Sequence, residues 1–124
     1  MAAPNIVNVT TITGKTSYVT PGTTSATTLL SNAASSNKVF KINQIVAANV
    51  NGTSAADTTV TINSAAAGGG TAYPIVSTVS VPADASLIVA DKTTAIYLEE
   101  DKSIVVTSGT ASAIAYTISY EEIS

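Results

Sequence analysis

The stretch AIAYTISYEEIS, residues 113–124, is the most regular pattern in the chain. Its larger apolar side chains, Ile114, Tyr116, Ile118 and Tyr120, alternate with small or polar residues. A period of two is the signature of a β-strand with one buried face. Because chain ends fray unless partners hold them, we expect this last strand to be paired inside a sheet and to form part of the core.

Similar alternation recurs upstream in a series of shorter segments. Turn signals, of which Asn51-Gly52 is the clearest, separate these segments at intervals of about eight to twelve residues. The chain is rich in Thr, Val and Ile, and β-branched side chains favour strands over helices. We therefore predict an all-β fold, an antiparallel β-sandwich of the jelly-roll or a related Greek-key type. The expected strands span residues 5–13, 16–20, 25–32, 38–50, 57–64, 72–81, 86–90, 95–99, 103–108 and 112–122.

Several local features follow from the same patterns. Gly14-Lys15 should form a turn, and Asn51-Gly52 should join residues 38–50 to residues 57–64 as a hairpin with a longer loop. Residues 65–70, AAAGGG, should form a flexible connector. A strand as long as 38–50 is expected to carry a bulge or bend. One of its faces is predicted to hold Phe40, Ile42, Gln44, Val46, Ala48 and Val50.

The size and composition suit one domain, residues 1–124, in which residues 1–13 form an N-terminal arm or edge strand. The chain contains no Cys and no His, which removes thiol nucleophiles, imidazole bases, disulfides and the usual zinc ligands. Its net charge is −3 and it has no Arg, so it lacks the basic patch that nucleic acid binding requires. We expect no enzymatic activity, no catalytic or metal site, no cofactor and no nucleic acid partner.

The hydrophobic residues are spread over short segments. Mean hydropathy is +0.35, yet no window approaches the roughly 18 to 20 apolar residues of a membrane helix, so we expect no membrane association. The first residues, MAAPNIVNV, lack the basic and apolar regions of a secretory signal. The protein is therefore expected to be made in the cytoplasm and to leave it only by lysis.

Two acidic groups are the densest polar features: Glu99-Glu100-Asp101 and Glu121-Glu122. Carboxylates bind calcium when six to eight oxygen ligands converge, but no loop here has an alternating series of Asp and Asn. Two carboxylates can also hydrolyse glycosides, although a sugar cleft usually adds aromatic platforms and the chain has no Trp and one Phe. We interpret both groups as solvated turns and strand ends.

The remaining motifs favour structural interpretations. The glycines 68–70 lack the Lys and the strand-loop-helix context of a phosphate-binding loop. Asn8-Val9-Thr10 and Asn51-Gly52-Thr53 match the glycosylation acceptor pattern, which has meaning only on a secretory route. Most of the five tyrosines are expected in the core or in subunit contacts; they are Tyr18, Tyr73, Tyr97, Tyr116 and Tyr120.

Two long segments carry a family resemblance. Residues 96–123, IYLEEDKSIVVTSGTASAIAYTISYEEI, resemble the ending of short virion proteins of tailed phages, especially marine cyanophages. Residues 32–62 resemble their central pair of long strands joined by an "ANxNG" turn, although Glu100-Asp101 replaces the commoner Gly-Asp of the terminal turn. The resemblance implies a structural subunit of the virion, assembled in the host cytoplasm, whose partners are other virion proteins.

Three functions of different classes are compatible with these observations. The first is a virion structural protein, most simply a capsid decoration protein that binds the major capsid protein, with a neck, tail or fibre subunit as the alternative. The second is a bacterial surface adhesion module, and the third is a carbohydrate-active enzyme that uses Glu99 or Glu121. Because small sandwiches expose edge strands that closed symmetry can cover, we expect a homo-oligomer, specifically trimers on a capsid.

Overall fold

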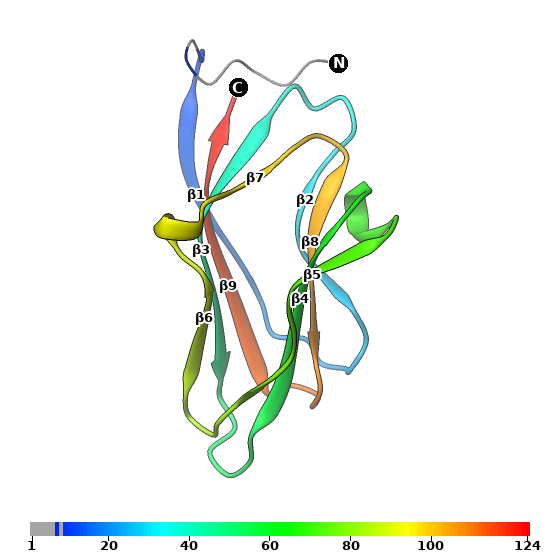
Figure 1. Cartoon of the computed structure of the whole chain (residues 1–124), viewed down its shortest axis with the longest axis vertical. Coiled ribbons are helices and arrows are strands. Elements are labelled where there is room, and N and C mark those ends of the chain that lie inside the picture. The colour runs from blue at the N-terminus through cyan, green and yellow to red at the C-terminus, as the bar shows by residue number, and fades with distance from the viewer. Residues whose placement is uncertain (1–6, 8) are drawn as a thin grey trace.

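The computed structural model describes residue 7 and residues 9–124. In this part of the chain, nine strands and two 3-10 turns, η1 (Ala66–Gly68) and η2 (Lys92–Thr94), form two antiparallel sheets packed face to face (Figure 1). The five-stranded sheet contains β1 (Ile12–Val19), β9 (Ile114–Ile123), β3 (Val39–Asn49), β6 (Ser86–Ala90) and β7 (Ile96–Leu98). The four-stranded sheet contains β2 (Thr27–Asn32), β8 (Lys102–Ser108), β4 (Ala56–Asn63) and β5 (Ala72–Val81).

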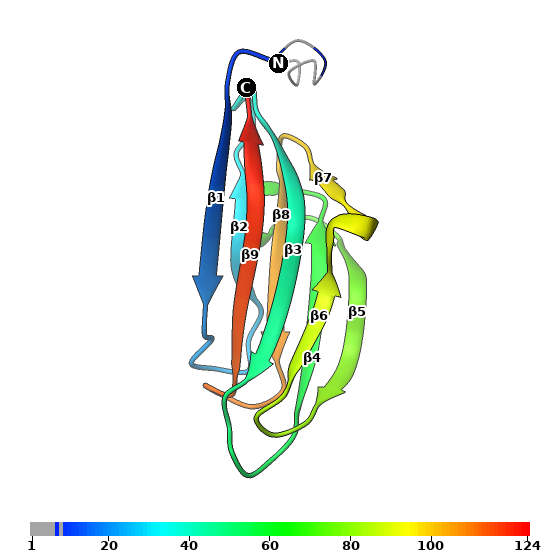
Figure 2. The same ribbon diagram turned by 90° about the vertical axis from the view of Figure 1, so that its left-hand side faces the viewer.

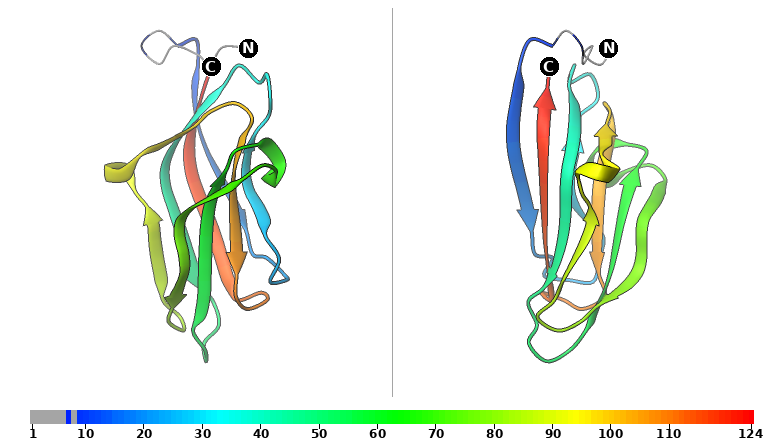
Figure 3. Two further views of the ribbon diagram at one scale, coloured as in Figure 1. Left: turned by 45° about the vertical axis from the view of Figure 1, so that its right-hand side comes forward. Right: turned by 60° about the vertical axis from the view of Figure 1, so that its left-hand side comes forward.

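The connections between the strands are those of a jelly roll. Both β6 and β7 pair with β3, so together they act as one strand that η2 interrupts. Apart from this interruption and the β4–β5 hairpin, each connection crosses from one sheet to the other (Figure 3), as the Greek keys of a jelly roll require. The predicted all-β sandwich is confirmed. The predicted hairpin at Asn51-Gly52 is wrong, because β3 and β4 belong to different sheets and residues 50–55 cross between them.

The last strand, β9, lies in the middle of the five-stranded sheet, between β1 and β3 (Figure 2). Ile114, Tyr116 and Ile118 are fully buried, and Tyr120 is 9% exposed, which confirms the alternation predicted for this stretch. Ile118 stands opposite Ser17 of β1 on one side and Ile45 of β3 on the other. The chain therefore ends on a strand whose backbone is paired along both edges.

Two buried asparagines connect the layers. Asn32, at the end of β2, donates from Nδ2 to the carbonyl of Leu98 on β7 at 3.0 Å. Asn49, at the end of β3, donates from Nδ2 to the carbonyl of Val81 on β5 at 2.9 Å. Both side chains are buried, and a buried polar group that loses its partner costs about 1 to 3 kcal/mol. These bonds fix the separation of the sheets at two places around the apolar core.

A bulge in β3 changes which of its side chains face the core. Ile42 and Gln44 pair with consecutive residues of β9, so Asn43 is an extra residue on β3. Beyond the bulge Ile45 is fully buried, whereas Val46 turns to the outer side. The expected bulge is confirmed, but the predicted single face is wrong from residue 44 onward. Because the extra residue shifts the period of two, the outer face carries Gln44, Val46 and Ala48, and Val50 beyond the strand is 58% exposed.

The start of the chain differs from its predicted pattern. Of the predicted strand 5–13, residues 5, 6 and 8 lie outside the described residues, and β1 begins only at Ile12. The predicted turn at Gly14-Lys15 is wrong, since both residues lie inside β1 and pair with β9. The β-branched residues on either side continue the strand through the glycine. The border strand of the sheet is β1, which shares only residues 12 and 13 with the predicted arm or edge strand of residues 1–13.

The segment of residues 65–70 is an ordered turn that packs on the four-stranded sheet. The Ser103 hydroxyl donates to the Ala65 carbonyl at 2.8 Å and accepts from the Gly68 amide at 3.0 Å. Ala67 and Gly68 have positive φ angles of 56° and 78°, the left-handed region that glycine favours. The predicted flexible connector is therefore wrong: hydrogen bonds close the loop into η1. The predicted strand 16–20 is the second half of β1, which begins at Ile12. The other predicted strands agree with the observed ones to within about two residues.

Candidate functional site

The acidic turn at residues 99–101 does not form a ligand cluster. Glu99 is exposed, and Asp101 accepts a hydrogen bond from the Ala66 amide at 3.1 Å. Glu100 is half-buried, with one carboxylate oxygen that has no hydrogen-bond partner. Among the described residues, no group of three or more acidic residues is placed to hold a metal ion. Asp101 therefore serves the neighbouring turn, and the acidic side chains of residues 99–101 are not gathered into a ligand cluster.

The second acidic pair is taken up by lysines. Glu122 contacts Lys15 on β1 at 2.8 Å and Lys38 at 3.0 Å. These two hydrogen bonds, that of Lys15 first, lower the pKa of Glu122, and the same contact raises the pKa of Lys15. Glu121 reaches Lys41 at 4.0 Å. The pair holds the ends of neighbouring strands together and leaves no free carboxylate for chemistry.

The other predicted motifs are structural or exposed. Asn51 accepts from the Thr53 amide and hydroxyl, both at 2.9 Å, so its side chain closes a turn. Asn8, in the other acceptor pattern, lies outside the described residues. Tyr116 is buried, and its hydroxyl shares a hydrogen bond with that of Thr58. Burial raises the pKa of Tyr116. Tyr120 is buried too, whereas three tyrosines are 45 to 77% exposed: Tyr18, Tyr73 and Tyr97.

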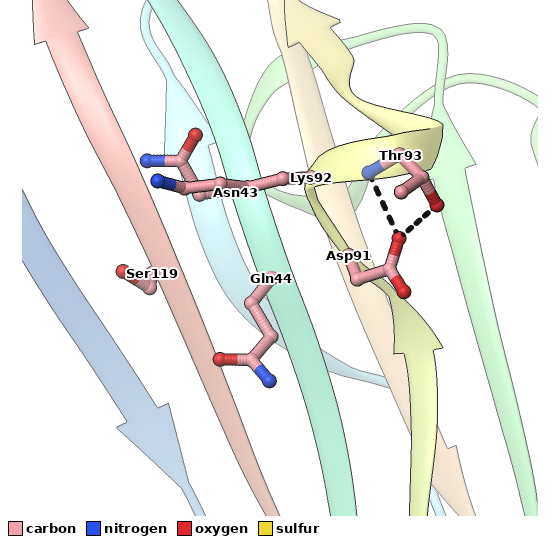
Figure 4. A pocket seen from close by; sticks show the side chains of 6 residues that line it. All are labelled: Asn43, Gln44, Asp91, Lys92, Thr93 and Ser119. Atoms are coloured by element: carbon pink, nitrogen blue, oxygen red, sulfur yellow. Dashed lines mark hydrogen bonds between the residues drawn. The ribbon is translucent and has the colours of Figure 1, made fainter.

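One depression of about 530 Å³ opens on the outer face of the five-stranded sheet. The β3 bulge turns two neighbouring amide side chains outward, and η2 rises beside them (Figure 4). Asp91 caps η2 by accepting from the Thr93 hydroxyl and from the Thr93 amide, the latter at 2.9 Å, and these hydrogen bonds, that of the hydroxyl first, lower the pKa of its carboxyl group. Lys92 extends across β3 toward Asn43 (Figure 4). The lining residues are Asn43, Gln44, Asp91, Lys92, Thr93 and Ser119.

The chemistry of this depression is hydrogen bonding rather than acid–base catalysis. Its lining combines two amides, two hydroxyls, one carboxylate and one ammonium group. The carboxylate of Asp91 already serves the turn, and a lowered pKa makes it a poor proton donor or acceptor near neutral pH. The lining fits a small, neutral, polar ligand such as a sugar unit. No acid and base are positioned there to act on such a ligand.

An apolar row crosses the same face of the sheet. Tyr18 of β1 stands opposite Thr117 of β9, Thr117 opposite Val46 of β3, and Val46 opposite Ile88 of β6. Directly opposed residues place their side chains on one face, so these four side chains form a line across β1, β9, β3 and β6, which lie in this order in Figure 2. Tyr18 is 77% and Ile88 59% exposed. We call these four residues the outer row.

The strand residues on either side of the outer row are uncharged, and the nearest charged side chains are Asp91 and Lys92, which line the depression beside Gln44 and Ser119. We call each set of outward-facing residues that stand opposite one another on neighbouring strands a level. The level next to the outer row on one side contains Ala115, Ala48 and Ser86, and the level on the other side contains Thr16, Ser119 and Gln44. Ion pairs begin only beyond these levels, at Glu121 and Lys41. Sequence reasoning missed this surface because it placed Val46 on the same face of the strand as Phe40 and Ile42. The signal was the polar Asn43-Gln44 pair inside an apolar run, which marks the bulge.

Comparison of the sequence with protein-family models found no match. Comparison with curated proteins found none either. Within the described residues, no helix is long and apolar enough to cross a membrane. The fold and its outer face are therefore the basis for a functional proposal, together with the resemblance of residues 32–62 and 96–123 to short virion proteins.

Proposed function

We propose that the protein is a non-enzymatic structural subunit of a phage virion, and specifically a capsid decoration protein. The observation that carries this proposal is the outer row, whose neighbouring strand residues are uncharged. Exposed apolar side chains that gather on one surface mark interaction sites more often than scattered ones do. Such a row suits contact with another folded protein, because few charges must be desolvated when it is covered.

The rest of the molecule supports a binding role over a catalytic one. The acidic side chains at residues 121 and 122 are engaged with lysines, and Asp91 caps a turn. A jelly roll with a buried last strand is a rigid module that presents its faces without rearrangement. In the proposed role it works in many copies or as a homo-oligomer, binds other virion proteins, foremost the major capsid protein, and is assembled in the host cytoplasm.

Purified particles test this proposal. Mass spectrometry should find the chain in virions, and imaging of the particle should place it on the head. Its presence on the neck, tail or fibre would support the alternative virion role. Absence of the chain from purified particles would overturn both.

A matched pair of variants tests the surface itself. Ile88→Asp places a charge in the outer row and should reduce occupancy on particles. Tyr73→Asp is the control, because Tyr73 has nearly the same exposure, 60% against 59%, but lies on β5 of the other sheet. Both variants should melt at similar temperatures. Equal particle occupancy of the two variants would show that the outer row is not the contact surface.

The polar depression favours a second candidate function, a surface adhesion module that binds glycans. Amide and hydroxyl groups recognise sugar hydroxyls by hydrogen bonding. The amides of Asn43 and Gln44 line the depression and point outward, where a ligand can reach them. A glycan array probed with the full chain tests this candidate. Binding that Gln44→Ala abolishes would support it, and absence of binding to any glycan would remove it.

A further inference from the structure

The strand β1 presents an unpaired backbone edge. Thr11 and Ser124 exchange two backbone hydrogen bonds, from Thr11 N to Ser124 O at 3.0 Å and back at 3.0 Å. In an antiparallel ladder such pairs alternate with wider ones, so residues 13, 15, 17 and 19 direct their amides and carbonyls toward β9. Ile12, Gly14, Thr16 and Tyr18 direct theirs away from it. Among the described residues β1 pairs only with β9, and Figure 2 shows no strand on its outer side.

The other border strands are interrupted, and β1 is not. The pairing of β2 shifts between Thr28 and Leu30. The strand β5 contains Pro74 and two register shifts against β4, and η2 separates β6 from β7. Breaks of this kind protect a sheet edge from pairing with another chain. By contrast, β1 holds one register with β9 over all its residues, from Ile12 to Val19.

The charge on β1 does not block its edge. Lys15 is the one charged residue of the strand, and its ammonium group lies 2.8 Å from the Glu122 carboxylate. The residues with outward-directed backbone groups, Ile12, Gly14, Thr16 and Tyr18, are all uncharged. They are also exposed, so an approaching strand would meet backbone groups flanked by neutral side chains.

We propose that two copies of this chain join β1 to β1 in antiparallel fashion about a two-fold axis, with Thr16 opposite Thr16 of the partner copy. Of the two-fold axes that such a pairing permits, those at Gly14, Lys15 and Thr16 pair at least three of the outward-directed residues of each copy. An axis at Lys15 places two like charges opposite each other, which destabilises a strand pair. An axis at Thr16 places Tyr18 opposite Gly14 of the other copy, twice.

The contact between Tyr18 and Gly14 selects the register at Thr16. Gly14 has open space where a side chain would stand, with no atom within 4 Å of a Cβ built there. Tyr18 is 77% exposed and lies on the same outer face as Gly14. An aromatic ring laid over a glycine on a neighbouring strand covers the exposed backbone. The three narrow pairs of this register exchange about six backbone hydrogen bonds.

The pairing would join the two five-stranded sheets into one continuous sheet and place the two outer rows in line. It replaces the trimer expected from the sequence with a dimer, because pairing of like edges closes on itself. The inference rests on the homo-oligomeric part of the proposed function. It is tested on purified protein alone, so that its failure leaves the virion role standing.

Sedimentation equilibrium of the purified full chain tests the pairing. The wild type should be a dimer, and Thr16→Lys should weaken self-association at least about tenfold, since two like charges then meet at the axis. Thr117→Lys, on the same face but on a fully paired strand, is the control and should leave the dimer intact. A wild-type monomer, a trimer, or equal effects of the two variants would overturn the proposal.

Single cysteines test the register, because the chain has no Cys of its own. Opposed residues of a narrow pair have Cα atoms about 5.5 Å apart, within the range that a disulfide spans. Thr16→Cys should therefore form a disulfide-linked dimer rapidly on mild oxidation, with Gly14→Cys and Lys15→Cys markedly slower. Faster crosslinking of either of these two variants would overturn the register. Equally slow crosslinking of all three would overturn the pairing.

Discussion

Replacement of Ile118 by Ala should cost this fold a large share of its stability. Ile118 is fully buried in the core and lies between Ser17 and Ile45 in the middle of the five-stranded sheet. Truncation removes three carbon atoms, worth about 0.8 kcal/mol each when buried, and leaves a cavity that the paired strands on either side prevent from collapsing. The expected loss is about 2 to 5 kcal/mol, against about 5 to 15 kcal/mol for a whole domain.

The neighbouring residue supplies the control. Thr117 lies next to Ile118 on β9 but is exposed on the opposite face, so Thr117→Ala should change the free energy of unfolding by no more than about 0.5 kcal/mol. At roughly 4 °C per kcal/mol for a chain of this size, Ile118→Ala should lower the melting temperature by about 8 to 20 °C. Thermal unfolding followed by circular dichroism measures both. Similar melting temperatures for the two variants would refute the position of β9 in the core.

Three further perturbations probe the ends of the chain and one turn. Because Lys15 and Lys38 hold the pKa of Glu122 below its ordinary value of 4.5, their contribution to stability is present above about pH 4.5 and is lost as the pH falls through the lowered pKa. Glu122→Gln should lower the free energy of unfolding by about 0.5 to 1 kcal/mol at pH 7. In denaturant titrations, the free energy of unfolding of this variant should differ less between pH 7 and pH 3 than that of the wild type. Deletion of residues 112–124 should prevent folding, since it removes the partner of both β1 and β3; a cooperative melt of the shortened chain would contradict this. Gly70→Ala should destabilise by about 1 kcal/mol or more, because residue 70 has a φ of +71° and a Cβ there would clash with neighbouring atoms; an unchanged urea midpoint would count against an ordered turn.

The β-sandwich was predictable because its evidence is local. Alternation with a period of two depends on neighbouring residues in one strand, and residues 114–120 show it without interruption. Turn residues between strands are local signals as well, which is why most strand boundaries agree with the prediction. The absence of His and Cys and the low number of charged residues can likewise be read without any geometry, and the prediction of a binding or structural role depends on them.

The partners of each strand could not be predicted, because hydrogen bonds between distant segments select them. Asn51-Gly52 can form a turn both in a hairpin within one sheet and in a connection between two sheets. Only the assignment of β3 and β4 to different sheets shows that it belongs to a connection between them. One extra residue, Asn43, reverses the orientation of every later side chain in β3, so Val46 joins the outer row instead of sharing the face of Phe40 and Ile42. The polar depression draws its lining from β3, η2 and β9. Such surfaces exist only where the fold brings these segments together, and no single segment encodes them.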